Sequence, residues 1–512
     1  MRNLPLFCIF CLCLIVVANA LIDVSHQATE TSMPSFRTID SGTAELSSST
    51  LDSFASRFRG ALIREKDNGY DGARRVWNSL IDKRPALIAR CSGVADVVEA
   101  IDLARQRDLL LAVRGGGHNV SGSAVCDGGL VIDLSAMHAV HVDQTARTVR
   151  VEGGATLADI DRETQRFGLA TTTGNVSKTG IAGLTLSGGF GNLRRKFGLG
   201  VDNLLSAEVV TADGAVVRTD ASTNSDLFWA VRGGGGNFGV VTSFEFQLHQ
   251  LGPEVMFAAQ FFSIGQAREA FRRWRDCMSD ARNEISSIAF FWTVPQADPF
   301  PEELRGGRVF LYGALYAGPA EEGEKALAPV MKIGTPILDL SGRGPYTQWQ
   351  QAFDPFFIPG SVYPRLYAYW KSLYLHGLDD ALIDDLVGRA RELPSEQCLI
   401  AIWQLGGALA RVPETATAFG RRSAPFLLSY DSCWTDPNQN DHVIAWTREQ
   451  IAAAEPYSPG GSYLNFPGVG EDNESLVRKA YGSNYERLAQ IKRIYDPRNL
   501  FRMNQNIGPA AA

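Results

Sequence analysis

Two glycine-rich segments constrain the fold of this chain more than any other feature. They read RGGGHNVSG at 114–122 and TGNVSKTGIAGLTLSGGFG at 173–191. Because glycine has no Cβ, successive N–H groups in such a segment can converge on an anion such as a pyrophosphate. A plain turn would explain a lone GGG run, but a second surface of small residues would let a broad, flat ligand lie against the main chain. The two segments together predict a fold built around a large cofactor.

Length and charge narrow the class of protein. A chain of 512 residues is long enough for two packed units and a buried ligand site. The formal net charge is −7 and no Lys- or Arg-rich run occurs, so the electrostatic footprint of a nucleic-acid-binding protein is missing. We therefore expect a small-molecule partner and no nucleic acid.

The N-terminal residues 1–20, MRNLPLFCIFCLCLIVVANA, resemble a secretory signal peptide because an apolar run follows Arg2 and ends at a small-residue site. The run is too short to span a bilayer comfortably, so we expect no stable membrane span. Residues 21–50 read as a Ser/Thr-rich leader. These features predict a secreted or extracytoplasmic protein, or a cytoplasmic one if Met33 is the true start.

Neither the cysteines nor the histidines indicate a metal site. The five cysteines beyond the N-terminal segment are widely spaced and form no CxxC pair, which fits neither a disulfide framework nor a zinc site. His138 and His141 would face opposite sides of an alternating strand and have no acidic or cysteine partner at ligand spacing. We expect core cysteines, surface histidines and no metal.

The pattern of strands and helices divides the chain. Over 51–250, strand-like segments alternate with helical ones, as in ALIARC, 93–108 and LLLAV, and Asp213-Gly214 is a hairpin signal. Over 251–455, a helix followed by paired strands recurs, which predicts one antiparallel sheet with helices on a single face. Residues 456–512 turn glycine- and asparagine-rich again and are expected to return to the first domain. The predicted fold class is α+β.

The motifs resemble those of the berberine bridge enzyme-like family of FAD-linked oxidases, in the vanillyl-alcohol-oxidase superfamily. The resemblance rests on RGGGHNVSG, TGNVSKTGIAGLTLSGGFG, DLFWAVRGGGGNFGVVTSFEF and YDPRNLFRMNQNI, and covers most of the chain from about residue 75. It implies a two-part PCMH-type FAD-binding domain with an inserted substrate domain at 251–455. The G-x-G-x-x-G at 234–239 is not a Rossmann motif, because a strand-like segment follows it.

The resemblance also implies how FAD is held. In this family the histidine behind the glycines is attached covalently to the flavin, which assigns that role to His118. Neutral imidazole, with an unperturbed pKa of about 6.5, is a competent nucleophile near neutral pH. The remaining cofactor contacts implied are Arg114, Gly115, Gly116, Gly117, Asn119, Ser121, Gly174, Thr179, Gly180, Gly183, Gly189, Val241, Asn504 and Asn506.

Three positions differ from the family pattern or refine it. Many members carry a second tether, a cysteine, where this chain has Val176, so the resemblance implies a single covalent bond. Thr179 has the shape of the valine that admits dioxygen in oxidases of the family. Phe190 stands where relatives with two tethers often have a tyrosine that assists catalysis.

The catalytic candidates come from one motif, whose tyrosine is the candidate base, and from the substrate domain. GSYLNF places Tyr463 and Asn465 in the family's Y-x-N motif, although a buried tyrosine can also serve packing alone. On a strand the two would share a face. The substrate domain offers Gln404, Ser429 or Asp431, whose direction depends on an unknown register. Its aromatic residues fit either a substrate pocket or an ordinary core: Phe291, Trp292, Tyr312, Tyr316, Tyr367, Tyr369 and Trp370.

These features predict an FAD-linked oxidase that takes hydride from a C–H bond alpha to oxygen or nitrogen and reduces dioxygen to hydrogen peroxide. The substrate would be a sugar, alcohol, alkaloid or polyketide, among which the fold does not choose. One alternative is a dehydrogenase of the same fold with a quinone-type acceptor. The other is a non-catalytic secreted binding protein, which the presence of His118, both glycine-rich segments and Tyr463 disfavours.

Overall fold

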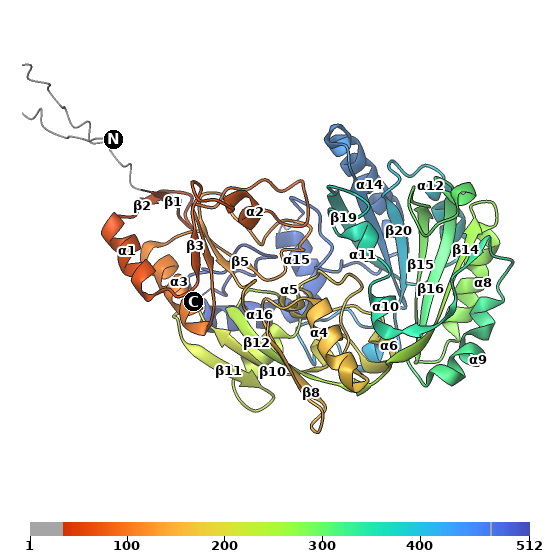
Figure 1. Ribbon diagram of the computed structural model, residues 1–512, viewed down its shortest axis with the longest axis horizontal. Coiled ribbons are helices and arrows are strands. Elements are labelled where there is room, and N and C mark those ends of the chain that lie inside the picture. Colours follow the sequence, from red (N-terminus) through yellow and green to blue (C-terminus); the bar gives the residue numbers. More distant parts are fainter. Residues whose placement is uncertain (1–33, 472–473, 512) are drawn as a thin grey trace, which may run out of the picture. The chain divides into compact units, whose positions relative to one another are not determined.

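The N-terminal part of the fold begins earlier than the sequence indicated. The computed structural model describes residues 34–471 and 474–511 (Figure 1), so the predicted signal peptide and the alternative start at Met33 lie outside the described residues. Residues 34–50, which we expected to belong to a leader, are folded: β1 (Ser35–Arg37) pairs with β2 (Thr43–Glu45), and α1 (Ser48–Arg57) follows. Phe36 and Leu46 are buried, because this hairpin covers part of a core.

A four-stranded sheet places the first glycine-rich segment. Its strand order is β3 (Ala61–Ile63), β4 (Leu87–Arg90), β6 (Leu130–Asp133), β5 (Leu111–Arg114), and β4, β6 and β5 run parallel. Helix α3 (Val94–Arg107) connects β4 to β5 and buries one apolar face. The predicted strand, helix and strand are confirmed, with β6 inserted between the two strands. RGGGH therefore leaves the carboxyl end of a parallel strand, where ligands commonly bind in such sheets.

A five-stranded antiparallel sheet follows in the chain. Its order is β11 (Val216–Asp220), β10 (Leu204–Val210), β12 (Val240–Gln247), β8 (Thr148–Glu152), β7 (Val140–Asp143). The hairpin predicted at Asp213-Gly214 joins β10 to β11, and Gly214 has φ 86°, which favours glycine. Strand β12 follows RGGGGNFG directly, so the rejection of a Rossmann motif there is confirmed.

An eight-stranded antiparallel sheet forms most of the second half (Figure 1). Its order is β17 (Leu338–Asp339), β14 (Glu254–Ser263), β16 (Arg308–Tyr316), β15 (Ile285–Thr293), β20 (Leu399–Gln404), β21 (Phe426–Trp434), β19 (Tyr367–Leu375), and β18 (Gly342–Pro345) pairs with β14. One face packs against α8 (Ala267–Ser279), α9 (Ala320–Met331), α12 (Asp380–Ala390) and α14 (Asn440–Ala454). The predicted sheet with helices on a single face is confirmed.

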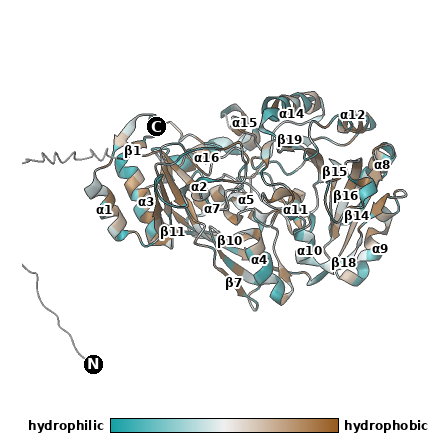
Figure 2. Cartoon of the chain, turned by 45° about the horizontal axis from the view of Figure 1, so that its top comes forward, coloured by the Kyte–Doolittle hydropathy of each residue, from teal (hydrophilic) through white to brown (hydrophobic). Residues whose placement is uncertain are grey.

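The other face of this sheet is covered too. All nine residues of β15, and all nine of β21, are buried, so neither strand has a side in water. Along β15, Phe291 belongs to the core under the helices, whereas Phe290 and Trp292 belong to a second core on the opposite face. Figure 2 shows apolar residues gathered in the strands, while the helices that cover them carry hydrophilic stretches. The second face is the one that meets the glycine-rich segments.

The C-terminal residues return to the first part of the chain, as predicted. Helices α15 (Glu474–Tyr481) and α16 (Tyr485–Tyr495) share a core with α7 (Ser225–Val231) and the five-stranded sheet. Lys492 of α16 and Asp496, directly after the helix, form a fully buried ion pair at 2.6 Å. Lys492 Nζ also donates to the carbonyl of Phe501, so the pair anchors the segment that follows α16. The limits predicted for the domains stay predictions, since residues 34–512 form one compact unit.

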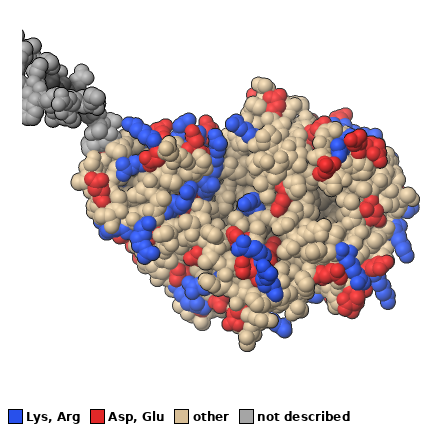
Figure 3. Space-filling model, viewed as in Figure 1, with Lys and Arg blue, Asp and Glu red and all other residues tan. Residues whose placement is uncertain are grey.

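The remaining short elements are β9 (Leu169–Ala170), β13 (His249–Gln250), α2 (Tyr70–Arg74), α4 (Leu157–Thr164), α5 (Ile181–Leu186), α6 (Arg194–Phe197), α10 (Tyr346–Gln350), α11 (Asp354–Phe357) and α13 (Ala408–Arg411). Over residues 34–471 and 474–511 no helix is long and apolar enough to cross a bilayer. Four of the five cysteines in this part are buried and none is bonded to another. His138 and His141 are exposed. Side chains of both charges are interspersed on the face in Figure 3.

Candidate active site

One cavity brings together both glycine-rich segments, the C-terminal segment and the face of the eight-stranded sheet that lies opposite the helices. The volume of this cavity, including the part that is open to solvent, is about 1790 Å³. The predicted site residues that line it are Gly115, Gly116, Gly117, His118, Asn119, Gly174, Thr179, Gly180, Gly183, Val241, Tyr463, Asn465 and Asn504. Thirteen positions spread over nearly 400 residues of sequence thus line one cavity, while their roles in cofactor binding and catalysis stay predictions.

Glycine is needed where the two glycine-rich segments meet. A Cβ on Gly116 would lie 2.4 Å from the main-chain nitrogen of Gly180, and a Cβ on Gly180 would lie 2.3 Å from that of Gly116. A Cβ on Gly183 would meet nothing within 4 Å, and Gly183 lines the cavity. The floor of the cavity is therefore bare main chain, on which a flat ligand can lie.

His118 is held in one orientation at this floor. Its ring stacks on Trp77 with centroids 4.6 Å apart and an interplanar angle of 19°. Trp77 is itself fixed, because its ring nitrogen donates to the carbonyl of Phe357 at 2.6 Å and its main-chain N–H donates to Gly117 at 2.9 Å. Burial lowers the pKa of His118 to about 4, so the imidazole is neutral at pH 7. Its Nε2 is buried and has no hydrogen-bond partner among the described residues.

Four predicted cofactor contacts lie outside the lining of the cavity: Arg114, Ser121, Gly189 and Asn506. Arg114 donates to the carbonyl of Ala73 in α2, and burial lowers the pKa of its guanidinium. Ser121 donates to Asn119 Oδ1 at 2.7 Å, so this pair shapes the loop. The structure thus gives Arg114 and Ser121 supporting partners, and contact of all four residues with a cofactor stays a prediction.

Unpaired amide atoms near the floor fit a polar ligand. One buried side-chain atom has no hydrogen-bond partner within the described part of the chain in each of Asn175, Asn504 and Gln505, which line the cavity, and in Asn506, which lies outside its lining. Leaving a buried polar atom unpaired costs about 1–3 kcal/mol, so such atoms are rare unless something else binds them. Together with the bare glycine floor and the free imidazole nitrogen, they fit a dinucleotide such as FAD.

Tyr463 lies between the glycine floor and the sheet, and only 1% of it is exposed. Its phenol oxygen accepts hydrogen bonds from the N–H groups of Gly189 and Phe190, both at 3.2 Å, and from Asn465 Nδ2 at 2.7 Å. The ring stacks on Phe190 with centroids 4.2 Å apart. Residues 463–466 form a turn rather than a strand. The turn nonetheless brings Asn465 to Tyr463.

The electrostatics of Tyr463 disfavour a phenolate. Burial raises the pKa of the phenol, and the hydrogen bonds from Asn465, Phe190 and Gly189 lower it by less. The phenol is therefore protonated at neutral pH. Since its oxygen accepts three hydrogen bonds and its own O–H has no acceptor among the described residues, that proton is available to a ligand.

The pairing of β20 and β21 shows which of the three polar candidates of the substrate domain faces the cavity. Asp431 lines the cavity and pairs across the sheet with Trp370 and Leu399. Gln404 points to the helix-covered face, where its Nε2 donates to the carbonyl of Met278 in α8 at 2.6 Å. Ser429 accepts a hydrogen bond from the ring nitrogen of Trp403 at 3.2 Å. Asp431 is thus the one acidic side chain that lines the cavity within the described residues.

Asp431 is poised to exchange a proton near neutral pH. Burial raises the pKa of its carboxyl group to about 7, and a hydrogen bond from Ser429 opposes that effect. Its Oδ1 is buried without a partner in the described part of the chain. A carboxyl group in a cavity with a pKa near the working pH is the usual arrangement for a general base.

Large rings surround Asp431, and most of them differ from those singled out in the sequence. Of that set only Trp370 lines the cavity, since Phe291, Tyr312, Tyr316 and Tyr369 belong to the core under the helices. The other aromatic residues of the wall are Phe290, Phe353, Phe357, Trp403 and Phe466. Alternation along β15 places Phe290 and Phe291 on opposite faces of the sheet, but the sequence does not say which of the two faces the cavity. Val176, Thr179 and Phe190 also line the cavity.

Comparison with known proteins also assigns an FAD-binding domain to this chain. The family model "FAD binding domain" matches residues 85–220, and "Berberine and berberine like" matches 462–508. An uncharacterized FAD-linked oxidoreductase of Bacillus subtilis is 31% identical over 461 residues, which is 89% of this chain and 98% of that protein.

Two further matches bear the names of hydroxynicotine oxidases. The (R)-6-hydroxynicotine oxidase of Paenarthrobacter nicotinovorans is 31% identical over 457 residues, 88% of this chain and 97% of that one. The crystal structure of 6-hydroxy-D-nicotine oxidase from Arthrobacter nicotinovorans matches with a TM-score of 0.78 at 28% identity, over 88% of this chain and 98% of that chain. With this similarity along nearly its whole length, the chain belongs to the berberine bridge enzyme-like family of FAD-linked oxidoreductases.

Proposed function

We propose that this enzyme is an oxidase that acts on a C–H bond alpha to oxygen or nitrogen. The substrate loses a hydride from that carbon and a proton from the attached oxygen or nitrogen, giving a C=O or C=N bond. Dioxygen takes up the two electrons and two protons as hydrogen peroxide. Bound FAD supplies the hydride acceptor, while the protein supplies binding and orientation. The observation that carries the proposal is that one cavity joins the glycine floor to Asp431 and Tyr463.

We assign the proton transfer to Asp431 and substrate orientation to Tyr463. A carboxylate with a pKa of about 7 accepts a proton readily at neutral pH, whereas burial leaves the phenol of Tyr463 protonated. Tyr463 instead offers its O–H to the oxygen or nitrogen of the substrate. Asn465 contributes by holding the phenol oxygen. This division moves the role of base from the tyrosine of the Y-x-N motif to the sheet.

We also propose a single covalent bond between FAD and His118. The neutral, stacked imidazole and its unpaired Nε2 support that bond. Val176 lines the cavity where relatives with two tethers carry cysteine, and valine forms no thioether. Export through residues 1–20 remains part of the proposal and rests on the sequence alone.

Dioxygen as acceptor is supported by Thr179, which lines the cavity and has the shape of valine. The oxidase named among the relatives also favours it. The rival is a dehydrogenase with a quinone-type acceptor. Photoreduced enzyme should reoxidise quickly in air, and Thr179→Leu should slow that step. Rapid reoxidation by a soluble quinone with negligible reaction in air would assign the chain to the dehydrogenases instead.

A further inference from the structure

The side of the cavity opposite the glycine floor is a wall of rings with one carboxyl group. Phe290 from β15, Trp403 from β20 and Trp370 from β19 face the cavity from one side of the eight-stranded sheet, with Asp431 from β21 among them. Asp431 is the cross-strand partner of both Trp370 and Leu399, so it lies flanked by apolar side chains.

The rings of this wall pack against one another and hold its shape. Trp370 meets Phe466 at 5.4 Å between centroids and Phe357 at 6.2 Å, both edge to face. Trp403 meets Phe466 at 5.9 Å, and Phe353 lies 5.2 Å from Phe290. Such pairs favour a fixed arrangement beyond the burial of apolar area. The wall is therefore a preformed, apolar surface.

The polar groups of the wall are already used, apart from Asp431. The ring nitrogen of Trp370 donates to Cys433 Sγ at 3.4 Å, and that of Trp403 donates to Ser429 at 3.2 Å. Asp431 Oδ1 is buried and unpaired within the described residues. A sugar brings several hydroxyl groups into a site, and each one left unpaired on burial weakens binding. This wall offers a partner to about one of them.

We propose that the substrate is a planar aromatic or fused-ring compound that carries one hydroxyl or amino group on the carbon to be oxidised, and that it is not a carbohydrate. The ring packs among Phe290, Trp370 and Trp403, and the O–H or N–H group donates to Asp431. For an alcohol, the O–H proton passes to Asp431 and the carbon that bears this oxygen gives its hydride to the flavin, so an aldehyde or ketone forms. An amine gives the imine in the same way. This inference rests on the proposed function.

Binding and reduction of the flavin test the two ideas separately. The probes are cinnamyl alcohol and benzylamine for the two aromatic arms, and glucose and cellobiose for the carbohydrate arm, mixed with holoenzyme without dioxygen. Cinnamaldehyde and gluconolactone, which are already oxidised at the carbon that loses hydride in cinnamyl alcohol and in glucose, serve as binding probes through their perturbation of the flavin absorbance. We expect cinnamaldehyde to bind about tenfold or more tightly than gluconolactone, and an aromatic arm to bleach the flavin.

The outcomes are distinct. If a sugar bleaches the flavin and the aromatic compounds do not, the substrate class is wrong and the oxidase proposal stands. If no compound bleaches the flavin although cinnamaldehyde binds tightly, the class survives and the oxidase proposal fails. If gluconolactone binds as tightly as cinnamaldehyde, the class is overturned whatever the bleaching result.

Two adjacent residues of β15 give a matched control. Phe290→Leu removes a ring from the wall, whereas Phe291→Leu removes one from the opposite face, under the helices. Phe290→Leu should weaken cinnamaldehyde binding severalfold and leave gluconolactone unchanged. Phe291→Leu should lower thermal stability without changing either dissociation constant. Equal effects of both variants on cinnamaldehyde binding would refute a direct contact with the ring.

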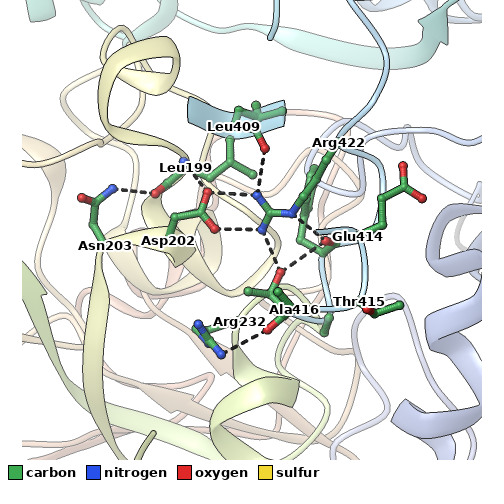
Figure 4. Close-up of polar contacts among 12 residues, drawn as sticks. Leu199, Asp202, Asn203, Arg232, Leu409, Glu414, Thr415, Ala416 and Arg422 are labelled. Atoms are coloured by element: carbon green, nitrogen blue, oxygen red, sulfur yellow. Dashed lines mark hydrogen bonds and ion pairs between the residues drawn. The ribbon is translucent and has the colours of Figure 1, made fainter. Parts of the chain in front are cut away.

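A second inference comes from a buried ion pair outside the cavity. Arg422 lies in the loop 405–425 that joins β20 to β21, and 1% of its side chain is exposed. Figure 4 shows its guanidinium binding both carboxylate oxygens of Asp202, at 2.8 and 3.0 Å. Arg422 also donates to Thr417 Oγ1 at 2.8 Å. The pair joins a loop of the eight-stranded sheet to the segment after the second glycine-rich segment.

Hydrogen bonds lead from this pair to Tyr463. Asp202 accepts from the N–H of Leu199, and the two residues after Leu199 donate to the carbonyls of Gly188 and Gly189, at 3.1 and 3.0 Å. The next N–H groups, those of Gly189 and Phe190, donate to the phenol oxygen of Tyr463. The turn at Gly188–Phe190 is thus held on one side by the segment that Arg422 fixes and binds Tyr463 on the other.

We propose that Arg422 is a positioning residue, which acts through Asp202 to keep two main-chain N–H groups aimed at the phenol oxygen of Tyr463. Phe419, in the same loop, supports the arrangement because its ring meets Phe190 at 5.8 Å and Tyr463 at 6.4 Å. Through these contacts the loop 405–425 packs against Phe190 and Tyr463, although Arg422 itself lies outside the cavity lining.

The test compares Arg422→Lys and Asp202→Asn with Arg74→Lys. Arg74 is also a buried arginine with two carboxylate partners, Asp71 and Asp82, far from this turn in the chain. Donors at the phenol oxygen lower its pKa, so their loss should move the alkaline limb of the pH profile, for both kcat/KM and cinnamaldehyde binding, to higher pH. We expect KM to rise about threefold with little change in kcat, as for a weakened contact of Tyr463 with the substrate, and Arg74→Lys to leave the pH profile in place.

A purely structural role would lower the thermal midpoint of both arginine variants and leave both pH profiles unchanged, which would overturn the proposal. Asp202→Asn keeps the volume of the carboxylate and is the second variant in case Arg422→Lys does not fold. If Asp202→Asn folds and its profile matches that of the unaltered enzyme, the route through Asp202 is refuted.

Discussion

The two sides of the cavity are built from different parts of the polypeptide. On the cofactor side, Gly116, Gly180 and Gly183 present main chain to the ligand. On the substrate side, the sheet presents large rings around Asp431. A main-chain surface cannot be altered without adding atoms, whereas a wall of side chains changes with every substitution. Any side chain at these three glycines should therefore weaken cofactor binding, whereas substitutions on the substrate side should change which substrate is accepted.

The largest expected effect comes from alanine at two glycines of the floor. In Gly116→Ala the new Cβ would lie 2.4 Å from the main chain of Gly180, so the segments must separate. Overpacking of this kind costs about 1–3 kcal/mol, occasionally more, and here the neighbouring atom is main chain that cannot rotate away. We expect poor folding and no bound flavin, measured by thermal unfolding and by flavin absorbance after purification.

Gly183→Ala sharpens this prediction. Its Cβ would enter the open cavity without meeting protein, so the fold should remain stable while FAD binding weakens. A Gly183→Ala protein that retains full flavin would show that the ligand does not lie against this part of the floor.

The next effect is the loss of the carboxyl group in Asp431→Asn, which keeps the shape of the side chain. General base catalysis contributes about 10²–10⁴-fold, so the limiting rate of flavin reduction should fall by that order. In the unaltered enzyme this rate should rise with pH through about 7, because only the ionised carboxylate accepts a proton. Stopped-flow reduction across pH measures both. A variant that keeps the rise through pH 7 would exclude Asp431 as the base.

The same variant should be more stable than the parent at high pH. Folding raises the pKa of Asp431 above its unfolded value of about 3.9, so its favourable contribution is complete below that pH and is lost as the pH rises through about 7. The advantage of Asp431→Asn should therefore be absent at pH 4 and largest above pH 7. Thermal unfolding at both pH values checks it.

Removal of His118 should change how FAD is held rather than whether it can bind. Acid precipitation of the unaltered enzyme should leave one flavin on a peptide that contains residues 114–122, and His118→Ala should release all of it. Stability of the variant should then depend on added FAD, with about 2.7 kcal/mol gained at 100 times the dissociation constant. His141→Ala, at an exposed histidine, is the control and should keep the covalent flavin. Flavin retained by His118→Ala after acid would place the tether elsewhere.

The cofactor side could be read from the sequence because its residues are consecutive. RGGGHN and TGNVSKTGIAG form loops whose chemistry is local, and their glycines have one physical use. The substrate side depends on strand pairing across the sheet. Nothing in FLLSYDSCW says which face Asp431 takes, and the answer came only from its pairing with Trp370 and Leu399.

Two further features lay beyond sequence reasoning for the same reason. Arg114 is the last residue of β5, beside the glycines, but its guanidinium turns to a carbonyl of α2, a contact made over 41 residues of sequence. Tyr463 and Asn465 meet through a turn, whereas the sequence argument brought them together only on a strand. Periodicity assigns a face only within a regular element, so it says nothing reliable about side chains in irregular segments.

The smallest expected effect concerns Tyr463, which lies where the two sides of the cavity meet. If its O–H donates to the substrate, Tyr463→Phe removes one hydrogen bond, whose net worth is about 0.5–1.5 kcal/mol. KM should rise about threefold to tenfold while the limiting rate of flavin reduction changes little, because burial raises the pKa of the phenol and leaves the proton transfer to Asp431. Tyr430→Phe, at a buried tyrosine of β21 in the core under the helices, should change neither quantity. A fall of 10²-fold or more in the limiting rate of Tyr463→Phe, with KM unchanged, would return the role of base to the tyrosine. It would also mean that bound FAD and substrate lower the pKa of that phenol enough to reverse the effect of burial.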